Sequence, residues 1–148
     1  MKNKIPQSQM MQTAGYSRTP LAKKLGIKDG FKIKLVNAPG YYLKLFPDFP
    51  KQTKLIIDDQ TNVDFVHFFC TNVADLNARI SSLKNQLHPA GMIWVSWYKK
   101  SAKIATDVTE DIIRQIAIQN GLVDIKVCAV DEKWSGLKLV IPVKDRII

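Results

Sequence analysis

Met92-Ile93-Trp94-Val95-Ser96-Trp97 is an almost uninterrupted apolar run, and Tyr98-Lys99-Lys100 follows it directly. Pro89-Ala90-Gly91 stands in front of the run and indicates where it begins. Such a run, rich in aromatic and β-branched residues, is typical of a strand that is covered on both faces of its sheet. This stretch therefore predicts a central strand that delivers aromatic and cationic side chains to one edge of a sheet.

Further strands and helices are predicted on both sides of this run. Asn72 is the natural N-cap of one helix, and Thr109 followed by two acidic residues begins another. Asp131–Ser135 joins the last two strands, and so short a connection makes them antiparallel. The other expected strands are 31–36, 54–57, 63–70, 122–130 and 136–143, and the expected helices are 21–25, 41–46, 73–87 and 109–120.

Strands separated by helices predict parallel neighbours with right-handed crossovers, and a terminal hairpin completes the sheet. The expected fold is a single α/β domain over residues 16–148, Rossmann-like and similar to methyltransferases. Its mostly parallel six-stranded sheet has the order 2-1-3-4-6-5 and ends in an antiparallel hairpin. Residues 1–15 are polar and lack periodicity, which predicts a flexible tail.

The composition indicates where the protein is located and which kinds of site it lacks. The 148 residues contain no apolar stretch long enough for a membrane span, and the N-terminus lacks the apolar region of a signal peptide. Cys70 and Cys128 lie in apolar runs, as reduced thiols of a cytoplasmic protein do. With two His and no Cys-x-x-Cys pair, no metal site is expected.

The net charge is +9, from 22 Lys and Arg against 13 Asp and Glu. Much of the excess lies within the first 34 residues and includes Lys23 and Lys24. A surplus of this size attracts polyanions such as RNA, and a solvated lysine surface is the alternative explanation. Nucleic-acid binding is not favoured, because the sequence carries no recognisable nucleic-acid-binding motif.

The carboxyl ends of the predicted strands should meet along one edge, where α/β sheets bind ligands. Asn37, Thr71 and Asn72 offer neutral hydrogen bonding there, and Asp58 offers a carboxylate for a ribose. Lys99 and Lys100 suit phosphate or carboxylate, while Trp97 and Trp134 offer flat walls. The candidate ligand-binding residues are Asn37, Asp58, Thr71, Asn72, Trp97, Lys99, Lys100, Trp134 and Ser135.

Structural roles compete with each of these assignments. Asn37 and Asn72 also suit a turn and a helix cap, and Asp58 suits a solvated loop. Lys99 and Lys100 suit a surface loop, and the tryptophans suit packing beneath loops. His67 in its apolar strand is interpreted as a core residue, on the face opposite to Cys70.

The turn after the first strand argues against an ordinary cofactor site. Nucleotide-binding Rossmann domains place a glycine-rich turn there so that the backbone approaches the cofactor closely. Here the turn is Asn37-Ala38-Pro39-Gly40, and proline has no N–H to donate. Ser135 is not in a Gly-x-Ser-x-Gly elbow either, so the sequence supplies no catalytic residue.

Several segments resemble a bacterial family of domains of unknown function. They include Trp94-Val95-Ser96-Trp97-Tyr98-Lys99-Lys100 and the longer stretch from Gly121 to Lys138, which contains Val127-Cys128-Ala129-Val130-Asp131-Glu132-Lys133-Trp134-Ser135-Gly136-Leu137. The similarity covers about residues 16–140. Tyr98 replaces the family's usual proline and Arg18 its usual glycine. The resemblance implies shared motifs and no mechanism.

The sequence thus favours a domain that binds a small anionic or nucleotide-like ligand, or a protein partner, without catalysis. The alternative is a divergent methyltransferase that uses S-adenosylmethionine. A second alternative is polyanion binding through the basic N-terminal third. No metal and no membrane are expected as partners.

Overall fold

The computed structural model describes residues 19–147, so the expected tail over residues 1–15 lies outside the described residues. Six strands form one sheet in the order β2-β1-β3-β4-β6-β5, which confirms the predicted order. The first four strands are parallel, and β6 runs antiparallel to both β4 and β5. The strands are β1 (Lys32–Val36), β2 (Lys54–Leu55), β3 (Val63–Phe69), β4 (Leu87–Tyr98), β5 (Val123–Ala129) and β6 (Trp134–Val140).

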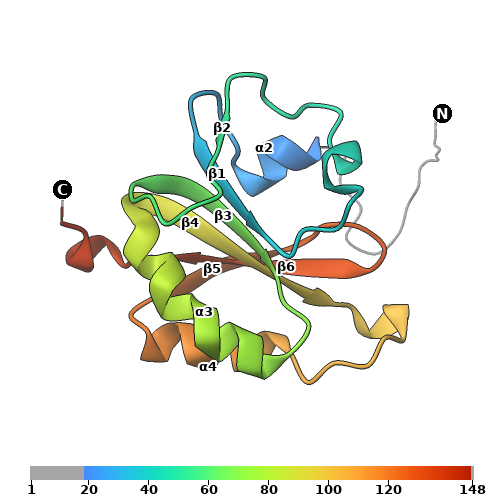
Figure 1. Cartoon of the computed structure of the whole chain (residues 1–148). Helices are drawn as coiled ribbons and strands as arrows, with labels where there is room; N and C mark the ends of the chain where they lie inside the picture. The colour runs from blue at the N-terminus through green and yellow to red at the C-terminus, as the bar shows by residue number, and fades with distance from the viewer. Residues whose placement is uncertain (1–18, 148) are drawn as a thin grey trace.

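Helices lie on both sides of this sheet (Figure 1). On one side are α3 (Val73–Gln86) and α4 (Glu110–Gln119); on the other are the short α2 (Leu21–Leu25) and the 3₁₀ helix η1 (Tyr42–Leu45). Two more 3₁₀ turns are η2 (Lys100–Ala102) and η3 (Val143–Asp145). The first side is called the α3/α4 face and the second the α2/η1 face.

The two long helices begin where the sequence predicts. The Asn72 side chain accepts a hydrogen bond from the Asp75 N–H at 2.8 Å, and Thr109 accepts one from the Ile112 N–H at 3.2 Å. Each cap satisfies a backbone donor that the first helical turn leaves free. Both N-cap predictions are therefore confirmed.

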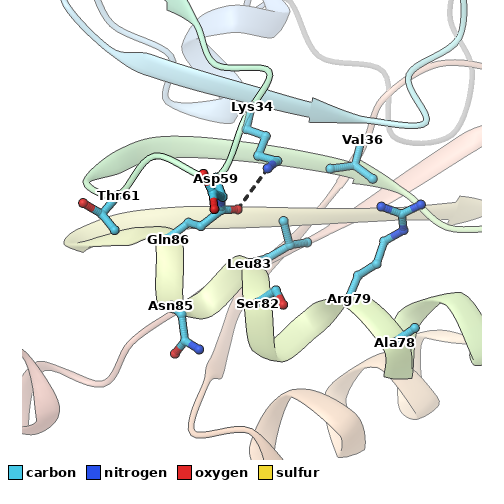
Figure 2. A pocket seen from close by; sticks show the side chains of 10 residues that line it. All are labelled: Lys34, Val36, Asp59, Thr61, Ala78, Arg79, Ser82, Leu83, Asn85 and Gln86. Carbon is cyan, nitrogen blue, oxygen red and sulfur yellow. Dashed lines mark hydrogen bonds between the residues drawn. The ribbon is translucent and has the colours of Figure 1, made fainter.

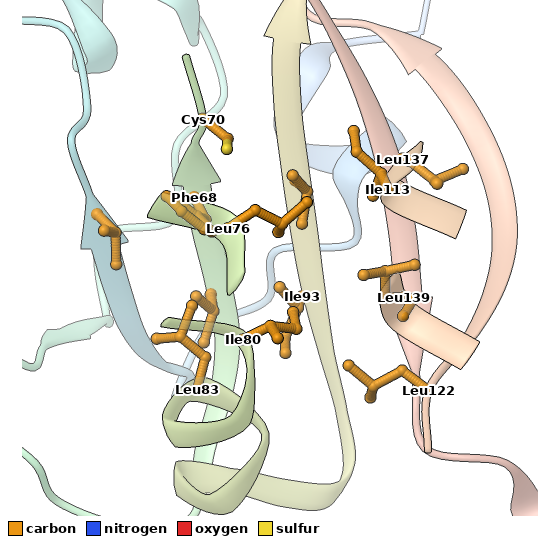
Figure 3. Packing of buried hydrophobic residues seen from close by; sticks show 14 of the residues in the cluster. Phe68, Cys70, Leu76, Ile80, Leu83, Ile93, Ile113, Leu122, Leu137 and Leu139 are labelled. Atoms are coloured by element: carbon orange, nitrogen blue, oxygen red, sulfur yellow. The ribbon is translucent and has the colours of Figure 1, made fainter. Parts of the chain in front are cut away.

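The α3/α4 face is sealed by aliphatic side chains (Figure 3). Leu76, Ile80 and Leu83 recur at helical spacing along α3 and are buried against Phe68 and Ile93 of the sheet. The apolar stripe that marks this helix in the sequence is thus the surface that it buries.

The α2/η1 face is sealed mainly by rings. Its cluster includes Tyr42, Phe65, Phe69, Trp94 and Trp134. The Trp94 indole N–H donates to the Leu25 carbonyl at 2.9 Å, which ties the end of α2 to the middle of the sheet.

The strands β4, β6 and β2 differ from their predicted ranges in ways that matter for the site. β4 begins at Leu87, directly after α3, so the expected break at residues 88–91 is part of the strand. Gly91 permits this because a Cβ there would lie 2.9 Å from the Val63 carbonyl oxygen of β3. β6 begins at Trp134, which is therefore a strand residue rather than part of the hairpin tip. β2 is only two residues long.

Candidate functional site

Three of the predicted site residues meet at the carboxyl ends of β1 and β3. Asn37 follows β1 with a left-handed backbone (φ 57°), and Thr71 and Asn72 follow β3. The Asn37 amide donates to the Asp75 carboxylate at 3.0 Å and to the Phe69 carbonyl at 3.5 Å. These contacts join the two strand ends into one polar edge, called here the β1–β3 edge.

The two carboxylates of this edge are not among the predicted ligand-binding residues. Asp75 lies in the first turn of α3 and also accepts from Arg79 Nε at 2.7 Å. Asp107 accepts from the Val73 N–H at 2.9 Å. The sequence did contain one signal for Asp75. It lies in the first turn after the predicted cap Asn72, and acidic residues are favoured near a helix N-terminus.

Cys70 lies beneath the same edge and is not a nucleophile in this setting. Its thiol is buried and donates to the Asn72 carbonyl at 3.2 Å. Burial raises its pKa to about 11, and the nearby Asp75 and Asp107 carboxylates add to the shift. The protonated thiol therefore has a packing role.

Asp58 is not at this edge, although the sequence placed it there. Its carbonyl accepts from Gln86 Nε2 at 3.2 Å and from Lys34 Nζ at 2.8 Å. Gln86 ends α3 whereas Asn72 caps its start, and a 14-residue helix is about 20 Å long. Because β2 has only two residues, the chain turns back across the sheet before Asp58. The expectation of a ribose-binding carboxylate at that position is thus wrong in its geometry.

The exposed Asp58 carboxylate instead organises its own loop. It accepts from the Gln60 backbone N–H at 3.2 Å and from the Gln60 side chain at 3.3 Å. These hydrogen bonds lower the pKa of Asp58. The residue behaves as the solvated loop carboxylate that was its alternative interpretation.

A groove runs beside α3, with Arg79 toward one end and Asp59 toward the other (Figure 2). This β1–α3 groove has a volume of about 520 Å³. Val36 and Leu83 supply apolar surface, Arg79 lies toward the carboxyl end of β1, and Lys34 donates to Gln86 Oε1 at 3.0 Å. Its lining residues are Lys34, Val36, Asp59, Thr61, Ala78, Arg79, Ser82, Leu83, Asn85 and Gln86.

A second cavity, of about 640 Å³, lies at the carboxyl end of β4 beside the start of α4. It is called the β4–α4 cavity. Trp97, Lys99 and Lys100 line it, so the structure brings these three predicted residues together. Thr106 also lines the cavity and donates to the Thr71 carbonyl at 2.7 Å, which connects the cavity to the β1–β3 edge.

Trp134 and Ser135 do not share this cavity. Ser135 is directly opposite Trp97 in the β4–β6 ladder, and Trp134 is opposite Tyr98. Trp97 packs against the α3/α4 face, whereas the buried Trp134 ring stacks on Tyr98 at 4.2 Å in the cluster of the other face. The two indoles therefore cannot form opposite walls of one site.

His67 is a core residue, as predicted. Its Nδ1 lies 2.9 Å from the Tyr42 hydroxyl and its Nε2 lies 2.7 Å from the Ser96 hydroxyl. All three residues are buried, and burial lowers the pKa of His67 to about 3. The imidazole is neutral at physiological pH and is enclosed on the face opposite to the packing of Cys70.

Residues 19–147 contain neither a cluster of metal ligands nor a membrane-spanning helix. No group of three or more His, Cys, Asp or Glu residues in this part of the chain is placed to hold a metal ion. None of its helices is long and apolar enough to cross a bilayer.

The fold matches solved methyltransferase structures. A protein assigned as a type 11 methyltransferase from Sulfolobus solfataricus superposes with a TM-score of 0.63 at 17% identity, over 86% of this chain and 93% of that one. A SAM-dependent methyltransferase from Aquifex aeolicus gives 0.58 at 17%, over 82% and 87% of the two chains. A ribosomal protein L11 methylase from Lactobacillus delbrueckii subsp. bulgaricus gives 0.55 at 12%, over 82% and 74%. No protein-family model and no curated protein matches the sequence.

These likenesses establish a methyltransferase-like Rossmann fold for the chain. They also correct the functional expectation. The solved structures that share this fold are named as methyltransferases, which contradicts the expectation of a binding domain without catalysis. The alternative of a divergent S-adenosylmethionine-dependent enzyme is the one that the comparisons support.

Proposed function

We propose that this chain is a methyltransferase that uses S-adenosylmethionine and binds it at the β1–β3 edge. One observation carries the proposal. The strand order reverses direction between β2-β1 and β3-β4, and the edge at that reversal bears polar side chains between two cavities. Open α/β sheets bind their ligands at such reversal points, beyond the carboxyl ends of the strands.

The chemistry of this edge fits the cofactor, which when bound supplies a methyl group activated by a sulfonium cation. Asp75 and Asp107 are carboxylates that suit a ligand with cationic groups and hydroxyls, and Asn37 adds an amide. The β1–α3 groove, whose volume of about 520 Å³ is typical of small-molecule sites, gives apolar surface for a planar base. Asn37, Asp75, Asp107 and the groove residues would hold the cofactor.

The turn after β1 is where this edge departs from glycine-rich cofactor sites. Pro39 has no N–H to donate, and the Asn37 side chain crosses the turn to reach Asp75. Recognition of the cofactor would therefore depend on side chains of α3 and of the turn after β1 more than on backbone N–H groups close to the cofactor.

The β4–α4 cavity is the proposed place of the methyl acceptor. Trp97 gives it a flat apolar wall, and Lys99 and Lys100 suit an anionic group on the acceptor. The acceptor would thus be a small anionic molecule with an apolar or ring-shaped body. A cytoplasmic location, expected from the unpaired Cys70 and Cys128, belongs to the same proposal.

The test compares two carboxylates at opposite ends of α3. Isothermal titration of the full chain with S-adenosylmethionine and S-adenosylhomocysteine should give binding, and Asp75→Asn should weaken it by about tenfold or more, as loss of a charged hydrogen-bond acceptor does. Asp58→Asn makes the same chemical change at the sequence-predicted position and should change affinity by less than about twofold.

Two outcomes would overturn the proposal. One is the absence of both binding and thermal stabilisation at saturating cofactor, since a ligand that binds the folded state must stabilise it. The other is a larger loss with Asp58→Asn than with Asp75→Asn, which would move the cofactor away from the β1–β3 edge. Circular dichroism of both variants checks that they are folded.

A further inference from the structure

Four lysines from three segments gather on the α2/η1 face of the β5–β6 hairpin. Lys126 and Lys138 are direct cross-strand partners, and Lys138 is also opposite Trp94, whose ring lies in the cluster of this face. Lys24 of α2 donates from Nζ to the Ala129 carbonyl at 3.2 Å, at the end of β5. Lys28 acts on Lys138 electrostatically, as Lys126 does. This set, Lys24, Lys28, Lys126 and Lys138, is called the hairpin lysine cluster.

The cluster concentrates positive charge that the fold does not neutralise. Among residues 19–147, every ion pair uses Arg79 or Arg114, so no lysine of the cluster belongs to one. The acidic residue of β5, Asp124, is bound to Arg114 of α4 at 3.1 Å, on the other side of the sheet. Burial and the neighbouring Lys126 and Lys28 lower the pKa of Lys138.

Such an arrangement opposes folding. Like charges directly opposite each other on neighbouring strands destabilise a sheet, and an opposite-charge pair at Lys126 and Lys138 would be the better choice for stability alone. Stability alone therefore does not explain this lysine pair, and functional sites are one place where proteins give up stability.

A second cross-strand lysine pair in the sheet has different surroundings. Lys32 and Lys54 are likewise opposite each other, on β1 and β2, but a carboxylate lies beside this pair. The Asp64 carboxylate accepts from the Lys32 backbone N–H at 2.8 Å, and Lys32 Nζ donates to the Thr61 carbonyl at 2.8 Å. That pair lies at the β2 edge of the sheet, whereas the hairpin lysine cluster lies at the β5 edge.

We infer that the hairpin lysine cluster binds the phosphate backbone of nucleic acid. Lysines act as compact point charges that suit phosphate, and several close together attract a polyanion. Lys28 and Lys126 are exposed and Lys24 and Lys138 half-buried, so the charge is presented on the surface. The net charge of +9 would add long-range attraction. Since the cluster supplies no base-reading group, binding would be independent of sequence.

This surface does not depend on the proposed enzymatic activity. It also differs from the basic N-terminal third that the sequence indicated, because half of its lysines lie near the C-terminus of the chain and become neighbours only in the folded sheet.

The experiment measures fluorescence anisotropy of a labelled oligouridylate with the full chain at increasing KCl. Binding should weaken with salt, with each phosphate contact adding about 0.7 to the log–log slope. Lys126→Glu should lower affinity by about tenfold and reduce the slope by about 0.7 or more. The same variant should raise the melting temperature, because Glu opposite Lys138 replaces a repulsive pair by an attractive one.

Lys54→Glu is the matched control, since it changes the net charge equally and also breaks a lysine pair. It should change RNA affinity by less than about twofold. Equal losses in both variants would mean that overall charge alone attracts RNA and would overturn the inference. So would binding that ignores salt, no binding at low salt, or a preference for anionic lipid vesicles over RNA. Cofactor titration of Lys126→Glu should match that of the unmodified chain.

Discussion

The two faces of the sheet are closed in different ways. The α3/α4 face is covered by helices of 14 and 10 residues whose aliphatic stripes fit against the strands. The α2/η1 face is covered by a helix of five residues, a 3₁₀ turn of four and irregular chain, and its interior is filled with rings. It also encloses the polar group formed by Tyr42, His67 and Ser96.

The difference shows how short elements can close a sheet. A long helix buries many medium-sized side chains in a regular row, whereas a short segment contributes few positions. Large rings compensate, since each aromatic side chain removes about 150–250 Å² from water. Stability on the α2/η1 face should therefore be concentrated in a few residues, and on the α3/α4 face it should be spread over many.

The largest effect should follow from Trp94→Ala. This change removes a fully buried ring and leaves the Leu25 carbonyl without its indole donor, so it should cost about 3–5 kcal/mol of unfolding free energy. Ile93→Val, at the preceding residue but on the α3/α4 face, should cost about 1 kcal/mol. Urea unfolding measures both. A smaller cost for Trp94→Ala than for Ile93→Val would show that stability is not concentrated in the rings.

The next effect is a pH dependence of the unfolding free energy that arises from His67 on the α2/η1 face. Burial holds His67 neutral by lowering its pKa from 6.5 to about 3. Between these values the unfolded chain binds the extra proton and the folded protein does not, so stability is full above about pH 6.5 and falls as the pH drops toward 3. The loss should amount to several kcal/mol on urea unfolding across this range.

Substitution of His67 separates this effect from general acid denaturation. His67→Phe should unfold with a much flatter pH profile above about pH 4.5, where the carboxylates remain ionised. It should also be less stable near neutral pH, because the Tyr42 and Ser96 hydroxyls lose their partner. Ile93→Val, which leaves His67 and its partners in place, should keep the original profile. Equal profiles for the two variants would contradict the assignment to His67.

The contrast between the faces also explains what the sequence could predict. Periodic stripes and caps are local signals, so α3, α4 and the strand order were predictable from residues such as Asn72 and Thr109. The role of His67 as a core residue followed from its apolar surroundings, but its partners Tyr42 and Ser96 come from distant elements.

The candidate site was less predictable because it depends on where strands end in space. Asp58 follows a strand pattern, yet β2 stops after two residues and the chain carries Asp58 to the other end of α3. Trp134 was assigned to a turn, and a two-residue shift of the strand start places it in the ladder opposite Tyr98. Since side chains alternate between faces along a strand, that ladder position puts Trp134 on the face away from Trp97.

The smallest effect should come from the α3/α4 face, where single local contacts each contribute little. Asn72→Ala removes the cap of α3 and should cost about 1 kcal/mol of unfolding free energy. Asn77→Ala makes the same substitution at an exposed position inside the same helix. It should stabilise the protein by up to ~0.7 kcal/mol, because alanine has the higher helix propensity. Changes of opposite sign in unfolding free energy, from the same substitution within one helix, would show that capping and helix propensity stabilise this face. Both can be read from the sequence. Equal signs would mean that tertiary contacts of Asn72 dominate, and the two faces would then differ less than their packing indicates.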